Sequence, residues 1–206
     1  NGLLATNKSL LVAEGAVRDA DNPITLALTS VTMSTGEGLC RMRDTDARPL
    51  QPRLSLQINK CVISSSGSVL VEHDGVGQAE DYEDALSIAG NVNYYEGVTD
   101  FWRIVANGIP QQQLVWDWKI WSKKEGGMDS ARQMIRWSRP RGEVPILPHE
   151  IGLNDYMPDM EPDNPTMNST EGSPKSGFDW RELPPIYSVP PEPPAEDDSQ
   201  PPPSST

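Results

Sequence analysis

The 206-residue sequence is poor in basic residues, cysteine and histidine, and it contains no long apolar run. Its 17 Lys and Arg are outnumbered by 30 Asp and Glu, so the chain lacks the basic surface with which proteins bind nucleic acid. Two cysteines, Cys40 and Cys61, are too few for a disulfide framework, and we interpret both as small buried hydrophobic residues. No segment approaches the roughly 18 apolar residues of a membrane span, and no signal peptide is visible, which leaves the compartment open.

Sequence motifs of common catalytic sites are also missing. There is no P-loop, dinucleotide-binding glycine motif, zinc-ligand spacing, nucleophile elbow or set of kinase motifs. His149 lies in a proline-rich stretch, and His73 lies between Glu72 and Asp74 on a predicted strand. Neighbouring strand residues point to opposite faces, so at most two of these three side chains could converge on a metal. We therefore expect no cofactor, no metal site and no phosphate transfer by this chain.

Acidic residues and prolines are concentrated towards the C-terminus. Residues 1–142 have a net charge of −2, residues 143–206 have −11, and 16 of the 20 prolines lie from Pro140 onward. Such a segment has too few large apolar groups to offset the entropy of ordering it, so we predict that residues 143–206 are mostly disordered. The stretch 176-SGFDWRELPPIY-187 has enough apolar side chains to dock, either on the folded part of the chain or on another protein.

An internal repeat of about 30 residues runs through the N-terminal half. Three copies share two apolar clusters with small or polar residues between them: 1-NGLLATNKSLLVA-13, 30-SVTMSTGEGLCRM-42 and 60-KCVISSSGSVLVE-72. A looser fourth copy follows in 90-GNVNYYEGVTDFWRI-104. An alternating segment precedes each later copy, and its apolar residues recur every 30 positions, as Leu26, Leu56 and Leu86 and as Leu28, Ile58 and Ile88.

Three short strands per repeat, separated by small and polar residues, predict an all-β fold in which equivalent apolar positions stack on one another. We predict a right-handed parallel β-helix of about four rungs over residues 1–105; a β-sandwich with coincidental spacing is the alternative. Because Asn1 aligns with Ser30, the first rung lacks its leading strand. We therefore expect the chain to be a piece of a longer polypeptide.

An aromatic block follows the repeats, and five of the six tryptophans lie between positions 102 and 137. Alternation in 114-LVWDWKIW-121 predicts a strand, and 131–137 suits a short helix with Asp129 or Ser130 as its N-cap. We predict that residues 106–142 cover the last rung as a cap. The alternative is a carbohydrate platform, for which the candidate ligand-binding residues are Trp116, Trp118 and Trp121.

Charged residues on the predicted rung strands are the candidates for catalysis. Enzymes of the β-helix class place several carboxylates, or Asp with Arg, in one shallow groove. We align Arg41 with Val12 and Arg103 with Val71, so no stacked carboxylate pair results, and surface ion pairs explain these residues better. The full set of candidates is Glu14, Arg41, Glu72 and Arg103.

The segments 1–15, 24–42 and 93–104 resemble the non-kinase C-terminal region of large planctomycete proteins described as serine/threonine protein kinases. The stretch 176-SGFDWRELPP-185 is similar to the "G-A-D-L-x-x-L-P" closing phrase of such regions, with Phe178 and Trp180 in place of smaller residues. The resemblance covers most of residues 1–185. It implies a bacterial, pectate-lyase-like β-helix joined to a kinase domain and a membrane segment outside this chain, and no functional residue carries over.

These observations lead us to expect a non-catalytic β-helix interaction or sensor module, the C-terminal part of a larger kinase-like protein. Its expected partners are a carbohydrate or a protein. Two alternatives stay open. One is a carbohydrate-active enzyme of the polysaccharide lyase or hydrolase type, and the other is a structural scaffold without a ligand.

Overall fold

The computed structural model describes residues 1–14, 23–43, 53–75, 82, 84–106, 113–126, 129–139, 152–161, 163–167 and 175–182. These residues form mostly strands in parallel sheets, with few helices, so the all-β class is confirmed. His149 and most of the segment 143–206 that was predicted to be disordered, namely residues 143–151, 162, 168–174 and 183–206, lie outside the described residues. No helix in the described part of the chain is long and apolar enough to cross a membrane.

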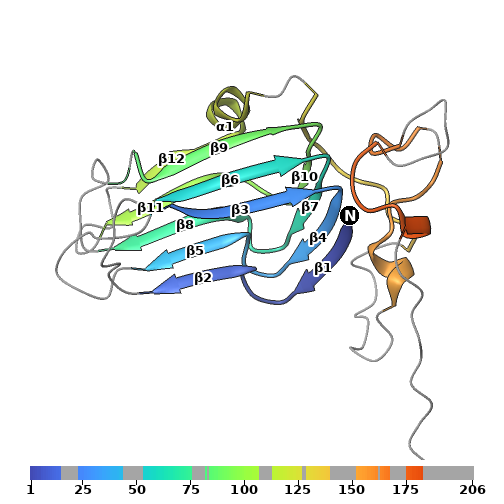
Figure 1. Cartoon of the computed structure of the whole chain (residues 1–206), viewed down its shortest axis with the longest axis horizontal. Coiled ribbons are helices and arrows are strands. Elements are labelled where there is room, and N and C mark those ends of the chain that lie inside the picture. The colour runs from blue at the N-terminus through green and yellow to red at the C-terminus, as the bar shows by residue number, and fades with distance from the viewer. Residues whose placement is uncertain are drawn as a thin grey trace, which may run out of the picture.

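The strands form three sheets (Figure 1). The first sheet runs in the order β1 (Gly2–Thr6), β4 (Val31–Thr35), β7 (Val62–Ser65), β10 (Tyr94–Glu96) and β13 (Ala131–Arg132). The second runs β12 (Gln113–Trp116), β11 (Asp100–Ala106), β8 (Val69–Gly75), β5 (Cys40–Arg43) and β2 (Leu11–Glu14). The third contains β3 (Ile24–Thr29), β6 (Leu54–Asn59) and β9 (Leu86–Asn91). Neighbouring strands of these sheets are parallel except β11 and β12, so strands of the repeats pair with the equivalent strand of the next repeat.

Apolar residues stack between repeats, with one change from the predicted register. Leu26 lies beside Leu56, as its spacing predicts, but the next residue in that row is Ile88, and Leu86 lies beside Leu54. The prediction that Leu86 continues the row of Leu56 was therefore wrong by two residues. A shift of two keeps the same side chains on the buried face of a strand, so the core tolerates it.

Sharp corners join the sheets at recurring positions. Ser30, Lys60 and Val92 follow β3, β6 and β9, and each has a positive φ of 52° to 54°. A second corner follows the first sheet, where Gly38 has a φ of +115° and a Cβ would lie 2.2 Å from the Val69 carbonyl oxygen. Only glycine fits at position 38, because any side chain would clash with the backbone of the next repeat.

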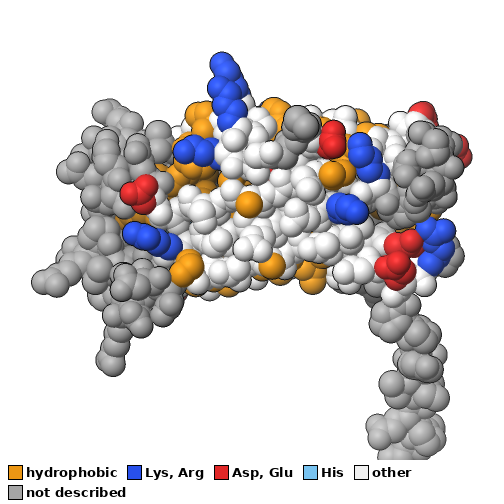
Figure 2. Space-filling model, turned by 45° about the horizontal axis from the view of Figure 1, so that its top comes forward, with side chains coloured by type: hydrophobic (Ala, Val, Ile, Leu, Met, Phe, Trp, Pro, Cys, Tyr) orange, Lys and Arg blue, Asp and Glu red, His pale blue; other side chains and the backbone are white. Residues whose placement is uncertain are grey.

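The core lies between the sheets and collects the inward residues of each repeat. Its members with at most 2% exposure are mainly aliphatic and aromatic, and they include both cysteines. They are Met33, Leu39, Cys40, Met42, Leu54, Leu56, Ile58, Cys61, Ile63, Leu70, Val71, Tyr82, Tyr95, Val98, Phe101, Trp102, Ile104 and Trp121. The outward rows of the third sheet are uncharged, and Figure 2 shows the charged side chains of this side towards its ends and over the helix.

The helix lies earlier in the aromatic block than the sequence predicted. The strand of this block ends at Trp116, and α1 (Trp118–Glu125) follows it. Asp117 caps α1 by accepting a hydrogen bond from the Ile120 amide at 3.0 Å, and Gly126 ends it in the left-handed conformation. The predicted strand over 114–121 was thus wrong in its second half, because a side-chain cap outweighed the alternating pattern.

The predicted helix over 131–137 is not formed. Residues Ala131–Arg132 are instead the strand β13, which pairs in parallel with Tyr94 and Tyr95. The Ser130 hydroxyl accepts a hydrogen bond from the Asn93 amide at 3.0 Å rather than capping a helix. The backbone donors that a helix would need pair with the sheet, so tertiary pairing overrides the local helical pattern.

The C-terminal segments lie beside the first sheet (Figure 1). We call residues 133–139, 152–161 and 163–167 the cover, and residues 175–182 the strap. The cover contains a short 3₁₀ helix at Leu153–Tyr156, and the strap contains another at Trp180–Glu182. The strap includes residues 176–182 of the stretch predicted to dock, whereas residues 183–187 lie outside the described part of the chain.

The strap contacts each repeat in turn. Ser176 donates a hydrogen bond to the Val92 carbonyl, the Gly177 amide donates to the Lys60 carbonyl at 2.8 Å, and the Phe178 amide donates to Thr32 Oγ1 at 3.1 Å. Asp179 then exchanges two hydrogen bonds with Asn1, at 2.9 and 3.0 Å. The strap therefore ties the fourth repeat to the first.

Candidate functional site

The three candidate tryptophans lie where the aromatic block meets the last repeat. Trp121 is fully buried and Trp116 is 9% exposed, whereas Trp118 is half-buried. Trp118 and Trp121 pack against Phe101 with ring centroids 5.3 Å apart in both cases. Trp116 stands edge-on to Trp102, with a centroid separation of 4.3 Å. These contacts use most of the ring surface of Trp116 and Trp121, and ligand binding by the three tryptophans stays a prediction.

The four catalytic candidates come together on the outer face of the second sheet. Arg41 lies beside Val12, as aligned, but Arg103 lies beside Glu72 and not beside Val71. The corrected register places Glu72 between two arginines, with ion-pair distances of 3.0 Å to Arg41 and 3.9 Å to Arg103. Glu14 lies in the neighbouring row and pairs with Arg43 at 3.4 Å. Between the last pair of β4 with β7 and the first pair of β5 with β8, the third repeat contains one residue more than the second repeat. This extra residue produces the change of register.

His73 points away from its charged neighbours in sequence and into the core. It is fully buried, and its Nδ1 accepts a hydrogen bond from the Trp102 indole at 2.8 Å. Burial lowers the pKa of His73 to about 4, so the imidazole is neutral at physiological pH. Among the described residues, no group of three or more His, Cys, Asp or Glu side chains could hold a metal ion. Cys40 and Cys61 are free and buried, and burial raises their pKa values to about 12 and about 11.

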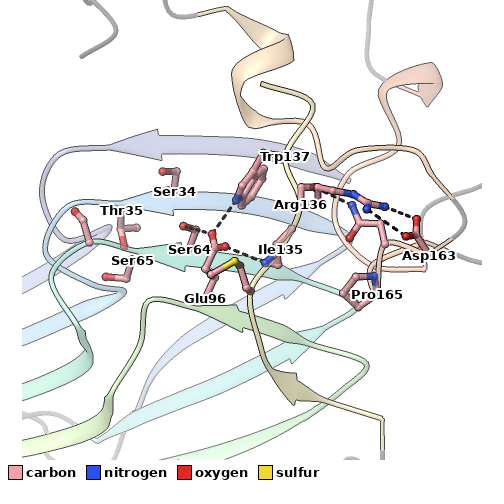
Figure 3. A pocket seen from close by; sticks show the side chains of 13 residues that line it. Ser34, Thr35, Ser64, Ser65, Glu96, Ile135, Arg136, Trp137, Asp163 and Pro165 are labelled. Atoms are coloured by element: carbon pink, nitrogen blue, oxygen red, sulfur yellow. Dashed lines mark hydrogen bonds and ion pairs between the residues drawn. The ribbon is translucent and has the colours of Figure 1, made fainter. Parts of the chain in front are cut away.

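A groove of about 740 Å³ lies between the outer face of the first sheet and the cover (Figure 3). Its floor is a row of side chains from neighbouring strands, in which Ser34 of β4, Ser64 of β7 and Glu96 of β10 stand side by side. Thr35 and Ser65 also border the groove, but they directly follow Ser34 and Ser64 along their strands, so their buried side chains point to the opposite face of the sheet. A smaller cavity of about 310 Å³ shares part of this lining and continues over β1 to Tyr156, so the polar floor extends across four strands.

Three hydrogen bonds hold the Glu96 side chain in the groove. Its carboxylate accepts hydrogen bonds from the Ser64 hydroxyl at 3.1 Å, the Ile135 amide at 2.9 Å and the Trp137 indole at 2.8 Å. Ile135 and Trp137 also pack with Val62 and Tyr94 on the outer face of the sheet. We call Met134, Ile135 and Trp137 the wall of the groove. Glu96 connects the floor of the groove to this wall, and both apolar and polar contacts fix the position of the wall.

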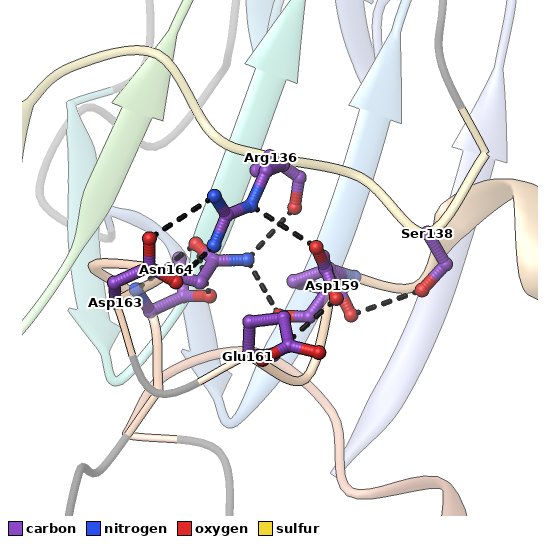
Figure 4. Close-up of polar contacts among 8 residues, drawn as sticks. Arg136, Ser138, Asp159, Glu161, Asp163 and Asn164 are labelled. Atoms are coloured by element: carbon purple, nitrogen blue, oxygen red, sulfur yellow. Dashed lines mark hydrogen bonds and ion pairs between the residues drawn. The ribbon is translucent and has the colours of Figure 1, made fainter.

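A second cluster of polar contacts holds the far side of the groove (Figure 4). Arg136 pairs with Asp159 at 3.0 Å and with Asp163 through two hydrogen bonds, one of which is 3.1 Å long. The Asn164 amide nitrogen donates to the carbonyls of Arg136 and Asp159, at 2.8 and 2.7 Å. The hydrogen bonds between Arg136 and Asp163 lower the pKa of the Asp163 carboxyl and raise that of the Arg136 guanidinium.

The floor of the groove was absent from the candidates chosen by sequence, although the sequence carries a signal for it. Ser34 and Ser64 are 30 residues apart and Glu96 follows 32 residues later, so the repeat itself places them in one row. The row lies next to core residues in sequence, and alternation therefore points it outward. The cover has no such signal, because residues 134–137 and 163–165 reach the groove through tertiary contacts alone.

No match to the chain was found among protein-family models, curated proteins or solved structures.

Proposed function

We propose that this chain is a right-handed parallel β-helix that serves as a non-catalytic recognition module, with its ligand in the groove over the first sheet. The β-helix proposal rests on three parallel sheets in which paired strands come from successive repeats, with corners at equivalent positions. We further propose, from the resemblance alone, that the module is the C-terminal part of a larger kinase-like protein.

The groove is the observation that carries the proposal of recognition. Its volume of about 740 Å³ suits a ligand of one or two sugar units, and its lining combines a hydroxyl-rich floor with apolar wall residues. Recognition sites commonly combine an apolar surface with a few fixed polar groups, and Glu96 is such a fixed group. Carbohydrate is the expected ligand, because its rings present both hydroxyls and apolar C–H faces.

Recognition without turnover is supported by the partners of the acidic groups. Glu96 accepts bonds from three donors that belong to the protein, and Asp163 is paired with Arg136. General acid and base catalysis on a glycoside needs two carboxyl groups that face the scissile bond. The carboxylates of this groove are engaged in holding the wall instead.

A carbohydrate-active enzyme is the second candidate, and one observation favours it. The fold brings Glu14, Arg41, Glu72 and Arg103 to one sheet face, where an acidic group and guanidinium groups lie within 3.9 Å of each other. Turnover of a polyuronate panel that Glu72→Gln or Arg103→Ala abolishes would establish this candidate. A structural scaffold, the third possibility, would show neither binding nor turnover.

The test is a glycan-array experiment on the full 206-residue chain, with a sugar-release assay on the same samples. We expect binding without turnover, and we expect Ser34→Tyr to weaken it at least tenfold because Ser34 lines both cavities. The matched control is Ser55→Tyr, which adds the same ring to the outer face of β6, in the third sheet. Equal binding by the two variants would contradict the location of the site.

A further inference from the structure

The acidic and basic side chains that line the groove differ in whether another side chain of the protein already neutralises their charge. Glu96 contributes a carboxylate to the floor, and in the described part of the chain no cationic side chain forms an ion pair with it. Its hydrogen-bond donors are a hydroxyl, a backbone amide and an indole, all of them neutral. These donors fix the carboxylate without cancelling its charge.

Arg136 contributes a cation to the lining, and its charge is already neutralised. It forms ion pairs with Asp159 and Asp163, and Figure 3 shows it directed away from Glu96, towards Asp163. Among the described lining residues, an anionic ligand would therefore meet an uncompensated carboxylate and no free guanidinium. At about 5 Å and an effective dielectric constant near 20, the repulsion between two carboxylates is large enough to weaken binding by more than tenfold.

The rest of the floor offers hydroxyl groups. Ser34 and Ser64 contribute hydroxyl groups to the floor and are half-buried, whereas Thr35 and Ser65 follow them along the strands and point to the opposite, buried face. A hydroxyl that lines a groove can both donate a hydrogen bond to a ligand and accept one from it. Ligand hydroxyls do both, whereas carboxylates only accept.

The wall adds an apolar surface. Met134 is 86% exposed at the groove and supplies most of this surface, because Ile135 and Trp137 beside it are largely buried against the sheet. The C–H faces of a sugar ring can pack on such a surface while the hydroxyls at the ring edge reach the floor.

We propose that the groove selects neutral saccharides and rejects their uronate counterparts, with Glu96 as the residue that sets this preference. This inference rests on the proposed function, since it assigns a ligand class to the same groove. It separates the groove from the enzyme candidate on the second sheet, whose predicted substrate is a polyuronate.

The experiment measures dissociation constants by titration calorimetry on the full chain with matched probes. The probes are cellobiose, mannobiose and α-1,4-galactobiose, each paired with the disaccharide in which both C6 hydroxymethyl groups are carboxylates. We expect at least one neutral disaccharide to bind at least tenfold more tightly than its uronate. In Glu96→Gln we expect that ratio to fall below threefold, because glutamine has a similar shape and no charge.

The ratio of the two dissociation constants is a sound measure even if Glu96→Gln displaces the wall of the groove. Such a displacement would weaken the binding of both disaccharides of a pair. Binding of the uronate as tight as that of the neutral sugar, or an unchanged ratio in Glu96→Gln, overturns the inference and leaves recognition in the groove standing. Absence of binding by all probes and across the glycan array overturns the proposed function and the inference together.

Discussion

The aromatic cap, formed by β12 and α1, and the strap are attached to the stack of repeats by different physical means. The cap buries rings, and Trp121 is fully excluded from solvent against Tyr95 and Phe101. The strap spans four repeats mainly through hydrogen bonds, with Phe178 as its buried apolar residue. Burial of large rings contributes several kcal/mol per residue, whereas a hydrogen bond contributes about 1 kcal/mol net. We therefore expect the strap to open locally while the cap unfolds only with the stack.

The largest effect should come from removing a buried ring of the cap. We expect Trp121→Ala to lower the free energy of unfolding by about 3 to 5 kcal/mol, because the side chain is fully buried and leaves a cavity. Urea denaturation of the full chain, followed by circular dichroism, measures it. Trp118→Ala is the control and should cost less, since Trp118 is only half-buried. Equal losses of unfolding free energy in the two variants would show that the difference in burial does not distinguish the two positions.

Acid should affect the stack through His73. The pKa of His73 is lowered to about 4 from its usual 6.5, so the neutral form stabilises the fold above pH 6.5 and this contribution is lost as the pH falls through 4. We expect the difference in unfolding free energy between the native chain and His73→Gln to shrink by about 3 kcal/mol from pH 7 to pH 4. Denaturation curves at several pH values test this. A constant difference would show that His73 is not held neutral.

The smallest effect on global stability should come from the strap. Gly177 has a φ of +88°, and a Cβ there would lie 2.5 Å from Thr32 Oγ1, so Gly177→Ala should undock the strap. Gly126→Ala is the matched control, because Gly126 has a φ of +78° and open space around it. We expect Gly177→Ala to abolish protection of the Gly177 and Phe178 amides from hydrogen exchange, with little change in global unfolding. If Gly177→Ala lowered the free energy of unfolding as much as Trp121→Ala does, the strap would belong to the same cooperative unit as the cap.

The repeats were predictable from the sequence because their signal is local and periodic. Alternation identified the buried faces of β3 and β6, and the spacing of 30 residues identified Leu26 and Leu56 as neighbours. The same argument failed by two residues at Leu86, because the sequence does not show in which turn an insertion is absorbed. The helix of the cap was misplaced for a related reason, since Asp117 was counted in an alternating strand and not as a cap.

The candidate site was only half predictable. Ser34, Ser64 and Glu96 occupy equivalent positions of the repeat, so their common row could have been derived from the sequence. The wall could not, because Ile135 and Trp137 are 39 and 41 residues from the glutamate to which they donate hydrogen bonds. The candidate tryptophans were chosen because the aromatic block is rich in tryptophan. The composition of a segment does not reveal that Trp116 and Trp121 are buried.

The sequence by itself determined the all-β class, the strands of each repeat and the side chains that face outward from them, since these follow from periodicity along the chain. Only the tertiary structure decided that the cover and the strap lie on the first sheet and that the cover forms a groove there. The physical reason is that a periodic pattern encodes contacts between equivalent residues, whereas the groove depends on single contacts between unrelated segments. Glu96 is the clearest case: its row is set by the repeat, and its role in the groove is set by Ile135 and Trp137.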